Sequence, residues 1–359
     1  MNLEEKQKKH TIIKTIDKYY FDREQLEEAA KIMKSGGLVA FPTETVYGLG
    51  GNAMEKEAAK KIYHAKGRPS DNPLIVHIAD MDALEKLVED IPENARKLAK
   101  KFWPGPLTMI LKKNVMVPRE TTGGLDSVAV RMPNHPIALE LIRQSGGYIA
   151  APSANTSGRP SPTLAKHVEE DLSGKIDYII DGGAVSVGLE STIVDLTGNT
   201  AVILRPGVIT KEDLEKIIGN IEYDPAVIQN KDAGNIIAKA PGMKYKHYAP
   251  KGKLIIVKGK MENVIRTINE QSVKKEQEGY QTGIIATEET KDSYHIGLVK
   301  SIGSREEEKS IAANLYKVLR EFDGTGTEYI YSESFEKGDL GQAIMNRLLK
   351  AAGYDVLEV

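Results

Sequence analysis

A lysine and an arginine flank a glycine at Lys66 and Arg68, in a stretch that reads KGRPSDNPLIVHI. An arginine side chain can bind phosphate oxygens with its planar fork of N–H groups, whereas a lysine acts as a point charge. Three lysines precede the pair, at Lys56, Lys60 and Lys61, and a solvated helix face explains these three better than a binding site does. Lys66 and Arg68 belong instead to a loop-forming stretch with glycine and proline, and they indicate a site for an anion.

Hydroxyl groups and a carboxylate follow a short apolar strand in the segment FPTETVYGLGG. Thr43, Glu44 and Thr45 would lie where this strand ends, which is the edge at which open α/β sheets bind ligands. The next glycines, Gly48 and Gly50, loosely fit the dinucleotide fingerprint G-x-G-x-x-A, but the polar stretch separates them from the strand and argues against an NAD site. A tight turn that needs glycine is the structural alternative.

A second cluster of hydroxyl and amide groups occupies the segment APSANTSGRPSP. Ser153, Asn155 and Ser161 are its candidates for ligand contact, and backbone N–H groups in such turns form concave nests for anions. An ordinary polar loop is the structural alternative. The chain has no Walker pattern G-x-x-x-x-G-K-[ST], and Ser153 is not on a G-x-S-x-G elbow, which argues against a serine hydrolase.

Polar side chains also lie at the ends of other predicted strands. Arg131 ends the apolar strand of DSVAVRMP, where a charge serves no purpose in packing. Ser191 opens the strand of GLESTIVDL and Arg205 closes the next one, in ILRPG, although both could cap strands structurally. His77 lies inside an apolar strand, and taken alone it is better explained as a core histidine.

The elements that would position these residues alternate between helical and strand patterns. Asp22 and Gln25 form a helix-start box, and apolar residues then recur at helical spacing up to Gly36. Some predicted strands follow one another without a helix between them, so the pattern predicts a mixed α/β sheet rather than a purely parallel one. The predicted strands are 38–41, 73–78, 107–111, 127–131, 148–151, 176–180, 191–196 and 201–204. The further predicted helices are 55–65, 94–102, 136–144 and 210–218.

The length of 359 residues favours two domains, because it exceeds what one hydrophobic core usually supports. The pattern runs through residues 15–218 and fades over residues 219–252, which contain the dense segment PGMKYKHYAPKG and are predicted to be a linker. It starts again over residues 253–359, where strands and helices predict a small α/β domain of the doubly wound, Rossmann-like kind.

Composition excludes several classes of protein. The chain has no cysteine, which excludes disulfides, thiolate zinc sites and iron–sulfur clusters. Its first residues lack the apolar core of a signal peptide and no apolar run approaches the roughly 20 residues that span a bilayer, so we expect a cytoplasmic protein without membrane contact. An RNA-binding module with a basic concave surface is the alternative from another class. A pI near 6.4 and an aromatic content of 6% disfavour it.

Taken together, these segments resemble the threonylcarbamoyl-AMP synthase family in its two-domain form. The strings PTETVYGLG, KGRPSDNPL, SVAVRMP, APSANTSG, STIVD and LRPG match in order over residues 25–210, and the linker and smaller domain extend the match to nearly the whole chain. The resemblance implies a YrdC-like first domain, a mixed twisted sheet with helices, whose concave surface holds all substrates. The L-threonine site would comprise Thr43, His77, Arg131, Ala151 and Ser191. The ATP site would comprise Arg68, Asn72, Ser127, Ser153, Asn155, Ser161, Arg205 and, from the linker acting as a lid, Tyr245 and Tyr248.

The resemblance also implies a reaction, for which Lys66 and Arg68 are the expected catalytic residues. Bicarbonate or CO2 adds to the threonine amine, and the resulting carbamate attacks the α-phosphorus of ATP with loss of pyrophosphate. Mg2+ is expected to bind mainly through the ATP phosphates, without metal-ligating side chains. A threonylcarbamoyl-transferase complex would then transfer the group to adenosine in tRNA. The alternative enzyme is a carbamoyl-transfer protein related to the hydrogenase maturation factors, which resemble this domain. Those factors carry cysteine-rich zinc fingers, and this chain has no cysteine, which argues against that alternative.

Overall fold

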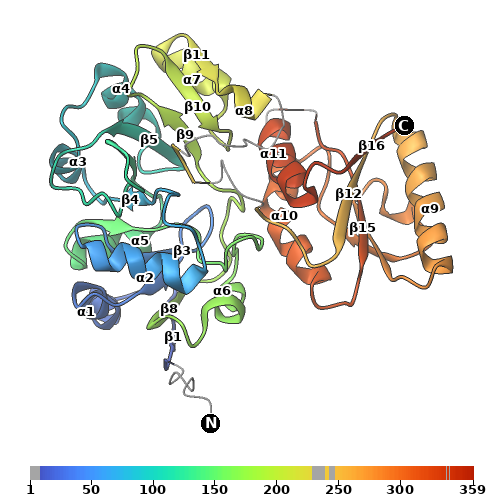
Figure 1. Ribbon diagram of the computed structural model, residues 1–359, viewed down its shortest axis with the longest axis horizontal. Coiled ribbons are helices and arrows are strands. Elements are labelled where there is room, and N and C mark those ends of the chain that lie inside the picture. Colours follow the sequence, from blue (N-terminus) through green and yellow to red (C-terminus); the bar gives the residue numbers. More distant parts are fainter. Residues whose placement is uncertain (1–8, 229–238, 242–246, 337, 339) are drawn as a thin grey trace.

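The computed structural model describes residues 9–228, 239–241, 247–336, 338 and 340–359. Two sheets, each covered by helices, divide the chain into a larger first part and a smaller second part (Figure 1). The predicted linker residue Tyr245 lies outside the described residues. No helix among the described residues has the length and apolar character needed to cross a membrane.

The described part of the first sheet has eleven strands in the order β1-β8-β2-β3-β7-β4-β6-β5-β9-β10-β11. Parallel pairs such as β4 with β6 alternate with antiparallel pairs such as β5 with β6, which confirms the predicted mixed sheet. The strands are β1 (Ile12–Thr15), β2 (Val39–Phe41), β3 (Gly48–Asn52), β4 (Ile75–His77), β5 (Leu107–Lys112), β6 (Ser127–Arg131), β7 (Ile149–Ala150), β8 (Tyr178–Asp181), β9 (Thr192–Asp195), β10 (Ala201–Arg205) and β11 (Ile221–Tyr223).

The helices of the first part begin and end largely where local sequence signals place them. The box of Asp22 and Gln25 opens a short 3-10 turn, Arg23–Leu26, which leads into α1. Gly67 ends α2 in the left-handed conformation, which turns the chain sharply before Arg68. The helices are α1 (Glu27–Lys34), α2 (Lys56–Lys66), α3 (Met81–Leu87), α4 (Glu93–Phe102), α5 (Pro136–Gln144), α6 (Ala165–Leu172), α7 (Lys211–Ile218) and α8 (Pro225–Ile228).

The second sheet is parallel throughout its described pairs and has the order β14-β13-β15-β12-β16. Helices α10 and α11 lie on the side that faces the first sheet, and α9 lies on the opposite side (Figure 1). This arrangement confirms the predicted Rossmann-like second part. Its elements are β12 (Lys253–Lys258), α9 (Met261–Gln277), β13 (Thr282–Ala286), β14 (Leu298–Ser301), α10 (Glu308–Phe322), β15 (Tyr329–Glu333), α11 (Gly341–Ala352) and β16 (Val356–Glu358).

The two parts share a hydrophobic cluster. Val46, Leu189 and Tyr248 pack with the buried residues of α10 and α11 rather than with the core of the first sheet. Gly188 has a φ of 82°, and a Cβ there would lie 2.4 Å from the Cα of Ala313 on α10, so only glycine allows this close approach. The second part is therefore packed directly against the loops that follow β2 and precede β9.

The segment 219–252 starts inside the first sheet. Strand β11 pairs in parallel with β10, and α8 follows it directly. The predicted linker therefore begins with two further elements of the first part. This difference arises because three-residue strands and one-turn helices are too short to give a sequence period.

Candidate active site

A cavity of about 690 Å³, a volume that includes space open to solvent, is lined by residues of the first part together with Pro241, His247 and Tyr248. All five residues of the predicted threonine set line it: Thr43, His77, Arg131, Ala151 and Ser191. Six residues predicted for catalysis or ATP binding also line it: Lys66, Arg68, Ser153, Asn155, Arg205 and Tyr248.

Strand register brings these residues together from distant parts of the sequence. His77, the last residue of β4, is paired with Arg131, the last residue of β6. Thr108 on β5 is paired with Arg131 and shares a hydrogen bond of 2.7 Å with the hydroxyl of Ser191. Arg205 at the end of β10 donates from Nε to the backbone oxygen of Ser191 at 3.0 Å and from Nη2 to its hydroxyl at 3.1 Å. A continuous polar wall results.

Lys66 is buried at the end of α2. Its Nζ donates to the backbone oxygens of Ser153 and Asn155, and it lies 3.4 Å from Asn155 Oδ1. Burial lowers the pKa of Lys66 well below its ordinary value, and the nearby charge of Arg68 lowers it further. The ammonium group therefore has neutral oxygen partners only, and it forms no ion pair within the described residues.

Arg68 turns into the cavity directly after Gly67. Its Nη2 donates to the backbone oxygens of Asn72 and Pro73, both at 3.2 Å, and its Nε has no acceptor among the described residues. Burial lowers the pKa of Arg68 to about 10, which leaves the guanidinium charged at neutral pH. Burial also lowers the pKa of Arg205. Arg68 and Arg205 make this end of the cavity cationic, and Lys66 adds a third basic group.

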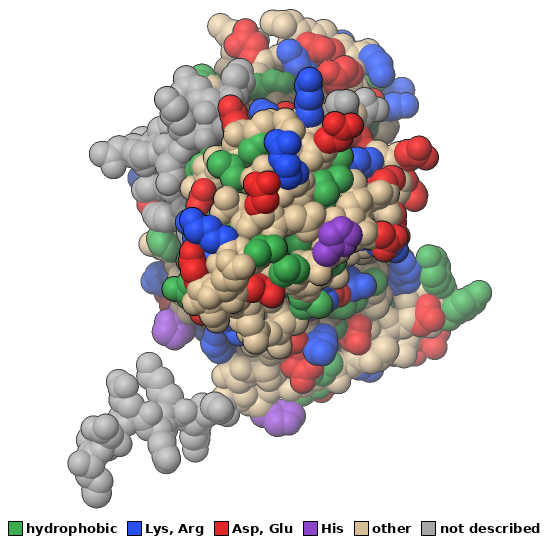
Figure 2. Space-filling view, turned by 90° about the vertical axis from the view of Figure 1, so that its right-hand side faces the viewer, with side chains coloured by type: hydrophobic (Ala, Val, Ile, Leu, Met, Phe, Trp, Pro, Cys, Tyr) green, Lys and Arg blue, Asp and Glu red, His purple; other side chains and the backbone are tan. Residues whose placement is uncertain are grey.

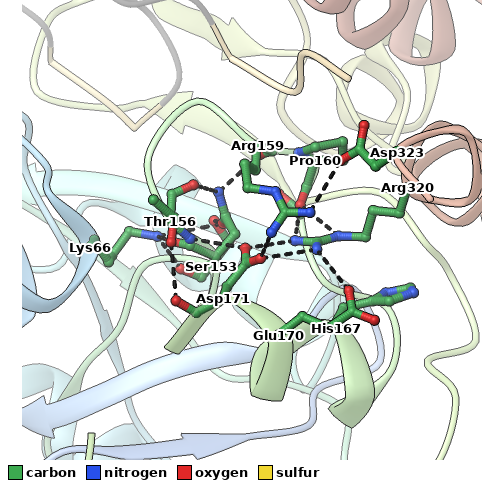
Figure 3. Close-up of polar contacts among 12 residues, drawn as sticks. Lys66, Ser153, Thr156, Arg159, Pro160, His167, Glu170, Asp171, Arg320 and Asp323 are labelled. Atoms are coloured by element: carbon green, nitrogen blue, oxygen red, sulfur yellow. Dashed lines mark hydrogen bonds and ion pairs between the residues drawn. The ribbon is translucent and has the colours of Figure 1, made fainter. Parts of the chain in front are cut away.

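The loop that follows β7 is fixed by a network of polar contacts (Figure 3). Within the loop, Asn155 Nδ2 donates to the backbone oxygens of Thr156 and Arg159 at 2.8 and 2.9 Å. Outside it, the buried carboxylate of Asp171 on α6 accepts from the backbone N–H of Thr156 at 3.0 Å and pairs with Arg159 and with Arg320 of α10. The second part of the chain therefore helps to hold the loop that carries Ser153 and Asn155.

A buried glutamate, Glu190, also lines the cavity. It accepts hydrogen bonds from Ser161 at 2.6 Å and from Tyr316 at 2.8 Å, and Arg347 lies 3.1 Å away. Burial alone would raise the pKa of Glu190, but Arg347 and Arg205, with these hydrogen bonds, lower it to about 2. Sequence reasoning missed Glu190, Tyr316 and Arg347, because the last two come from α10 and α11 and no local motif marks such distant pairs.

The other end of the cavity is polar but carries a balanced charge. Thr43 and Thr45 share a hydroxyl hydrogen bond of 2.8 Å, and Arg131 Nη1 donates to Thr45 Oγ1 at 2.9 Å. Arg131 Nη2 lies 2.7 Å from a carboxylate oxygen of Glu44. Burial, and then Arg131, lower the pKa of His77 to about 3, so this imidazole is neutral at neutral pH.

Three predicted ATP-site residues do not line the cavity. Ser161 donates a hydrogen bond to Glu190, which lines the cavity. Ser127 lies at the start of β6, at the other end of the strand from Arg131. Asn72 is fully buried, and neither polar atom of its side chain has a partner among the described residues. From the predicted lid segment, Tyr248 lines the cavity with a φ of 66° and stacks on Tyr316 at a ring distance of 5.1 Å.

Comparisons with known proteins agree over nearly the whole chain. A family model described as telomere recombination (Sua5_yciO_yrdC) matches residues 31–207, and one described as the C-terminal domain of threonylcarbamoyl-AMP synthase (Sua5_C) matches residues 209–353. Proteins named threonylcarbamoyl-AMP synthase are similar to it: that of Pyrococcus abyssi is 53% identical over 342 residues (94% of this chain, 98% of the relative), and that of Bacillus subtilis is 50% identical over 335 residues (93% and 94%).

A solved structure gives the same result. The crystal structure of P. abyssi Sua5 complexed with L-threonine superposes with a TM-score of 0.91 at 50% identity, and the match covers 97% of this chain and 100% of that one. Sequence and structure comparisons thus agree over both parts of the molecule. The chain belongs to the threonylcarbamoyl-AMP synthase family, in the form that carries a C-terminal domain.

Proposed function

We propose that this chain is an enzyme, a nucleotidyltransferase, that makes L-threonylcarbamoyl-AMP from L-threonine, bicarbonate or CO2, and ATP, with release of pyrophosphate. The observation that carries the proposal is the division of one cavity into two chemically different ends. Arg68 and Arg205, with Lys66 as a third basic group, make one end cationic, as a polyphosphate requires. The other end offers hydroxyls and a charge-balanced arginine, as an amino acid requires. The names of the relatives support threonylcarbamoyl-AMP as the product, and the L-threonine complex of the P. abyssi protein supports threonine as a substrate.

Threonine would bind at the end that Arg131 lines. The guanidinium of Arg131 is the cation there, so the carboxylate of the amino acid would lie against it. The hydroxyl of Thr43 and the neutral ring of His77 line the same end, and we propose that they contact the amine and hydroxyl groups of the substrate. Holding the amino acid by three polar groups fixes its amine relative to the nucleotide, and such positioning supplies a large share of catalysis in reactions between two bound molecules.

The chemistry would then need little covalent help from the protein. The threonine nitrogen bonds to the carbon of CO2 and loses a proton, which gives a carbamate. One carbamate oxygen bonds to the α-phosphorus of ATP while the bond from that phosphorus to the pyrophosphate oxygen breaks. Lys66, Arg68 and Arg205 would stabilise the negative charge that develops on the phosphates, which is the main contribution proteins make to such transfers.

Mg2+ would accompany the nucleotide. The described residues contain no group of three or more His, Asp or Glu side chains that could hold a metal ion. Phosphate oxygens are preferred Mg2+ ligands, so we propose that the ion binds mainly through ATP, where it would neutralise phosphate charge. No step proposed for the side chains depends on a metal held by the protein.

The product of this reaction is a mixed anhydride, which hydrolyses readily and must be protected from water. We therefore propose that the segment around Tyr248, which already reaches the cavity, covers the bound substrates. We further propose that a threonylcarbamoyl-transferase complex consumes the product and modifies adenosine in tRNA, in the cytoplasm. Figure 2 shows acidic and basic side chains interspersed over one face of the second part, so the coloured residues of that face form no continuous basic surface for RNA.

One incubation tests the proposal directly. The purified full chain, given ATP, L-threonine and bicarbonate, is expected to form threonylcarbamoyl-AMP, detected by mass, together with pyrophosphate. Omission of threonine should abolish both products. Formation of ADP and orthophosphate instead would show that attack does not occur at the α-phosphorus, and the adenylation mechanism would be wrong.

A further inference from the structure

The charge of Arg131 is balanced by a carboxylate that no part of the proposed mechanism uses. Glu44 follows Thr43 in the loop after β2, and it is 7% exposed. Its Oε1 lies 2.7 Å from Arg131 Nη2, and both side chains are almost completely buried. Neither carboxylate oxygen accepts a hydrogen bond from the described residues. Glu44 therefore acts on its surroundings mainly through its charge.

Other groups near Glu44 do not cancel that charge. His135 lies close enough to be influenced by Glu44, but burial lowers the pKa of His135 to about 4, so its ring is neutral at neutral pH. The backbone oxygen of Glu44 accepts from the N–H of Val187 at 2.8 Å, which fixes the main chain and leaves the carboxylate unaffected. Glu44 and Arg131 are thus a buried pair whose net charge is close to zero.

The opposite end of the cavity has a different charge balance. Lys66, Arg68 and Arg205 form no ion pair within the described residues and donate to oxygen atoms without a net charge. Two buried carboxylates lie near this end, and both have arginine partners outside the cavity: Glu190 is paired with Arg347, and Asp171 with Arg159 and Arg320. The cavity therefore has one end with excess positive charge and one end, at Arg131, with none.

We propose that Glu44, acting through its ion pair with Arg131, makes the amino-acid end of the cavity select a zwitterion over a simple anion. The proposal rests on the proposed function, since it takes threonine as the ligand at Arg131. Glu44 is a specificity-determining residue in this scheme rather than a catalytic one.

The physical reason is electrostatic. A ligand that offers only a carboxylate gains from Arg131 but is repelled by the carboxylate of Glu44, which lies 2.7 Å from Arg131 Nη2. In an amino acid the ammonium group is only two bonds away from the carboxylate carbon, and its attraction to Glu44 offsets that repulsion. Because the site is buried, screening by solvent is weak and the difference is large. Phosphate groups are excluded from this end for the same reason and remain at Lys66, Arg68 and Arg205.

The test compares two ligands that differ in the ammonium group. L-threonine and 3-hydroxybutyrate share a carboxylate and a hydroxyl, and the second lacks the amine. Their dissociation constants are measured by calorimetry on the full-length wild type, on Glu44→Gln and on Glu140→Gln. Glu140 is a matched control, because it is as buried as Glu44 and pairs with arginines, but its partners Arg23 and Arg143 do not line the cavity, whereas Arg131 does. ATP affinity and thermal unfolding are measured on the same samples.

We expect the wild type and Glu140→Gln to prefer threonine, and Glu44→Gln to lose at least tenfold of that preference, which corresponds to about 1.4 kcal/mol. ATP affinity should stay unchanged in Glu44→Gln. An unchanged preference in folded Glu44→Gln would overturn the inference while leaving the proposed function intact. Equal binding of both ligands by the wild type would overturn it even if the variant did not fold. Absence of threonine binding by the wild type would overturn the proposed function itself.

Discussion

The second part of the chain supplies the arginine that pairs with Glu190 in the cavity wall, and removing that arginine has a predictable cost. Arg347 of α11 is fully buried, its Nε lies 3.1 Å from Glu190 Oε2, and its Nη1 donates to the backbone oxygen of Pro206. Replacing Arg347 with Met keeps most of its volume and leaves Glu190 buried without its main cation. Breaking one side of a buried ion pair costs about 3–5 kcal/mol of folding free energy.

The pKa of Glu190 reports the net effect of its surroundings. Burial raises it, but Arg347, then Arg205 and the hydrogen bonds of Ser161 and Tyr316, lower it from 4.5 to about 2. Because the folded-state pKa lies below the unfolded value, this stabilisation is fully present above the unfolded pKa and is lost as the pH falls from about 4.5 to about 2. Without Arg347, burial would oppose ionisation. The variant should therefore be most impaired at neutral pH.

Urea unfolding at neutral pH and at a pH just below 4.5 measures both effects. Arg347→Met should unfold at a lower urea concentration than the wild type, and the difference should narrow at the lower pH. Adding Glu190→Gln should restore part of the loss, because the unpaired charge is then removed. Arg266→Met on α9 is the control, since its ion pair with Glu270 is largely exposed. Equal midpoints for Arg347→Met and Arg266→Met would refute the reasoning.

Two further predictions concern the proposed reaction. Lys66→Ala and Arg68→Ala should each lower kcat/KM by a factor that corresponds to about 2–4 kcal/mol, as loss of a preorganised electrostatic donor does. Lys60→Ala, on the exposed face of α2, is the control and should leave kcat/KM unchanged. Near-normal kcat/KM in both folded cavity variants would contradict the assigned role. Serine, which keeps the hydroxyl, should compete with threonine better than valine in initial-rate assays, and equal use of valine and threonine would show that the pocket is not polar.

Much of the first sheet could be predicted because its strands are apolar and its helices amphipathic. Strand β6 and helix α5 have the predicted bounds, since both are bordered by clear turn or proline signals. Strand β3 was missed because its sequence, GLGGN, lacks branched residues. The structure explains that composition: a Cβ at Gly50 would lie 2.8 Å from side-chain atoms of Phe41 and Ile149. Packing of neighbouring side chains, which a local pattern does not contain, requires glycine there.

Helix α6 was missed for a different reason. It buries two polar residues, His167 and Asp171, on the face that a sequence pattern would place in solvent. Asp171 can be buried because it pairs with Arg159 and with Arg320, and Arg320 is 149 positions further along the chain. The same limit applies to the site. Residues in compact motifs, such as Lys66 and Arg131, line the cavity as predicted. Glu190 lies in the segment GLESTIVDL, but its burial requires Tyr316 of α10 and Arg347 of α11, which no local pattern reveals.

The charges around the cavity explain why the second part of the chain belongs to the site. Two buried carboxylates are paired with arginines at the cavity. Glu44 pairs with Arg131, a lining residue of the first part, and Glu190, itself a lining residue, pairs with Arg347 of the second part. If Arg347 were absent, Arg205 would be the nearest cation left to compensate Glu190, since both lie at the cavity and already influence each other's pKa. Arg205 would then be less available to a phosphate. The second part thus keeps the cationic end of the cavity cationic, although its described residues supply none of the cations that line it.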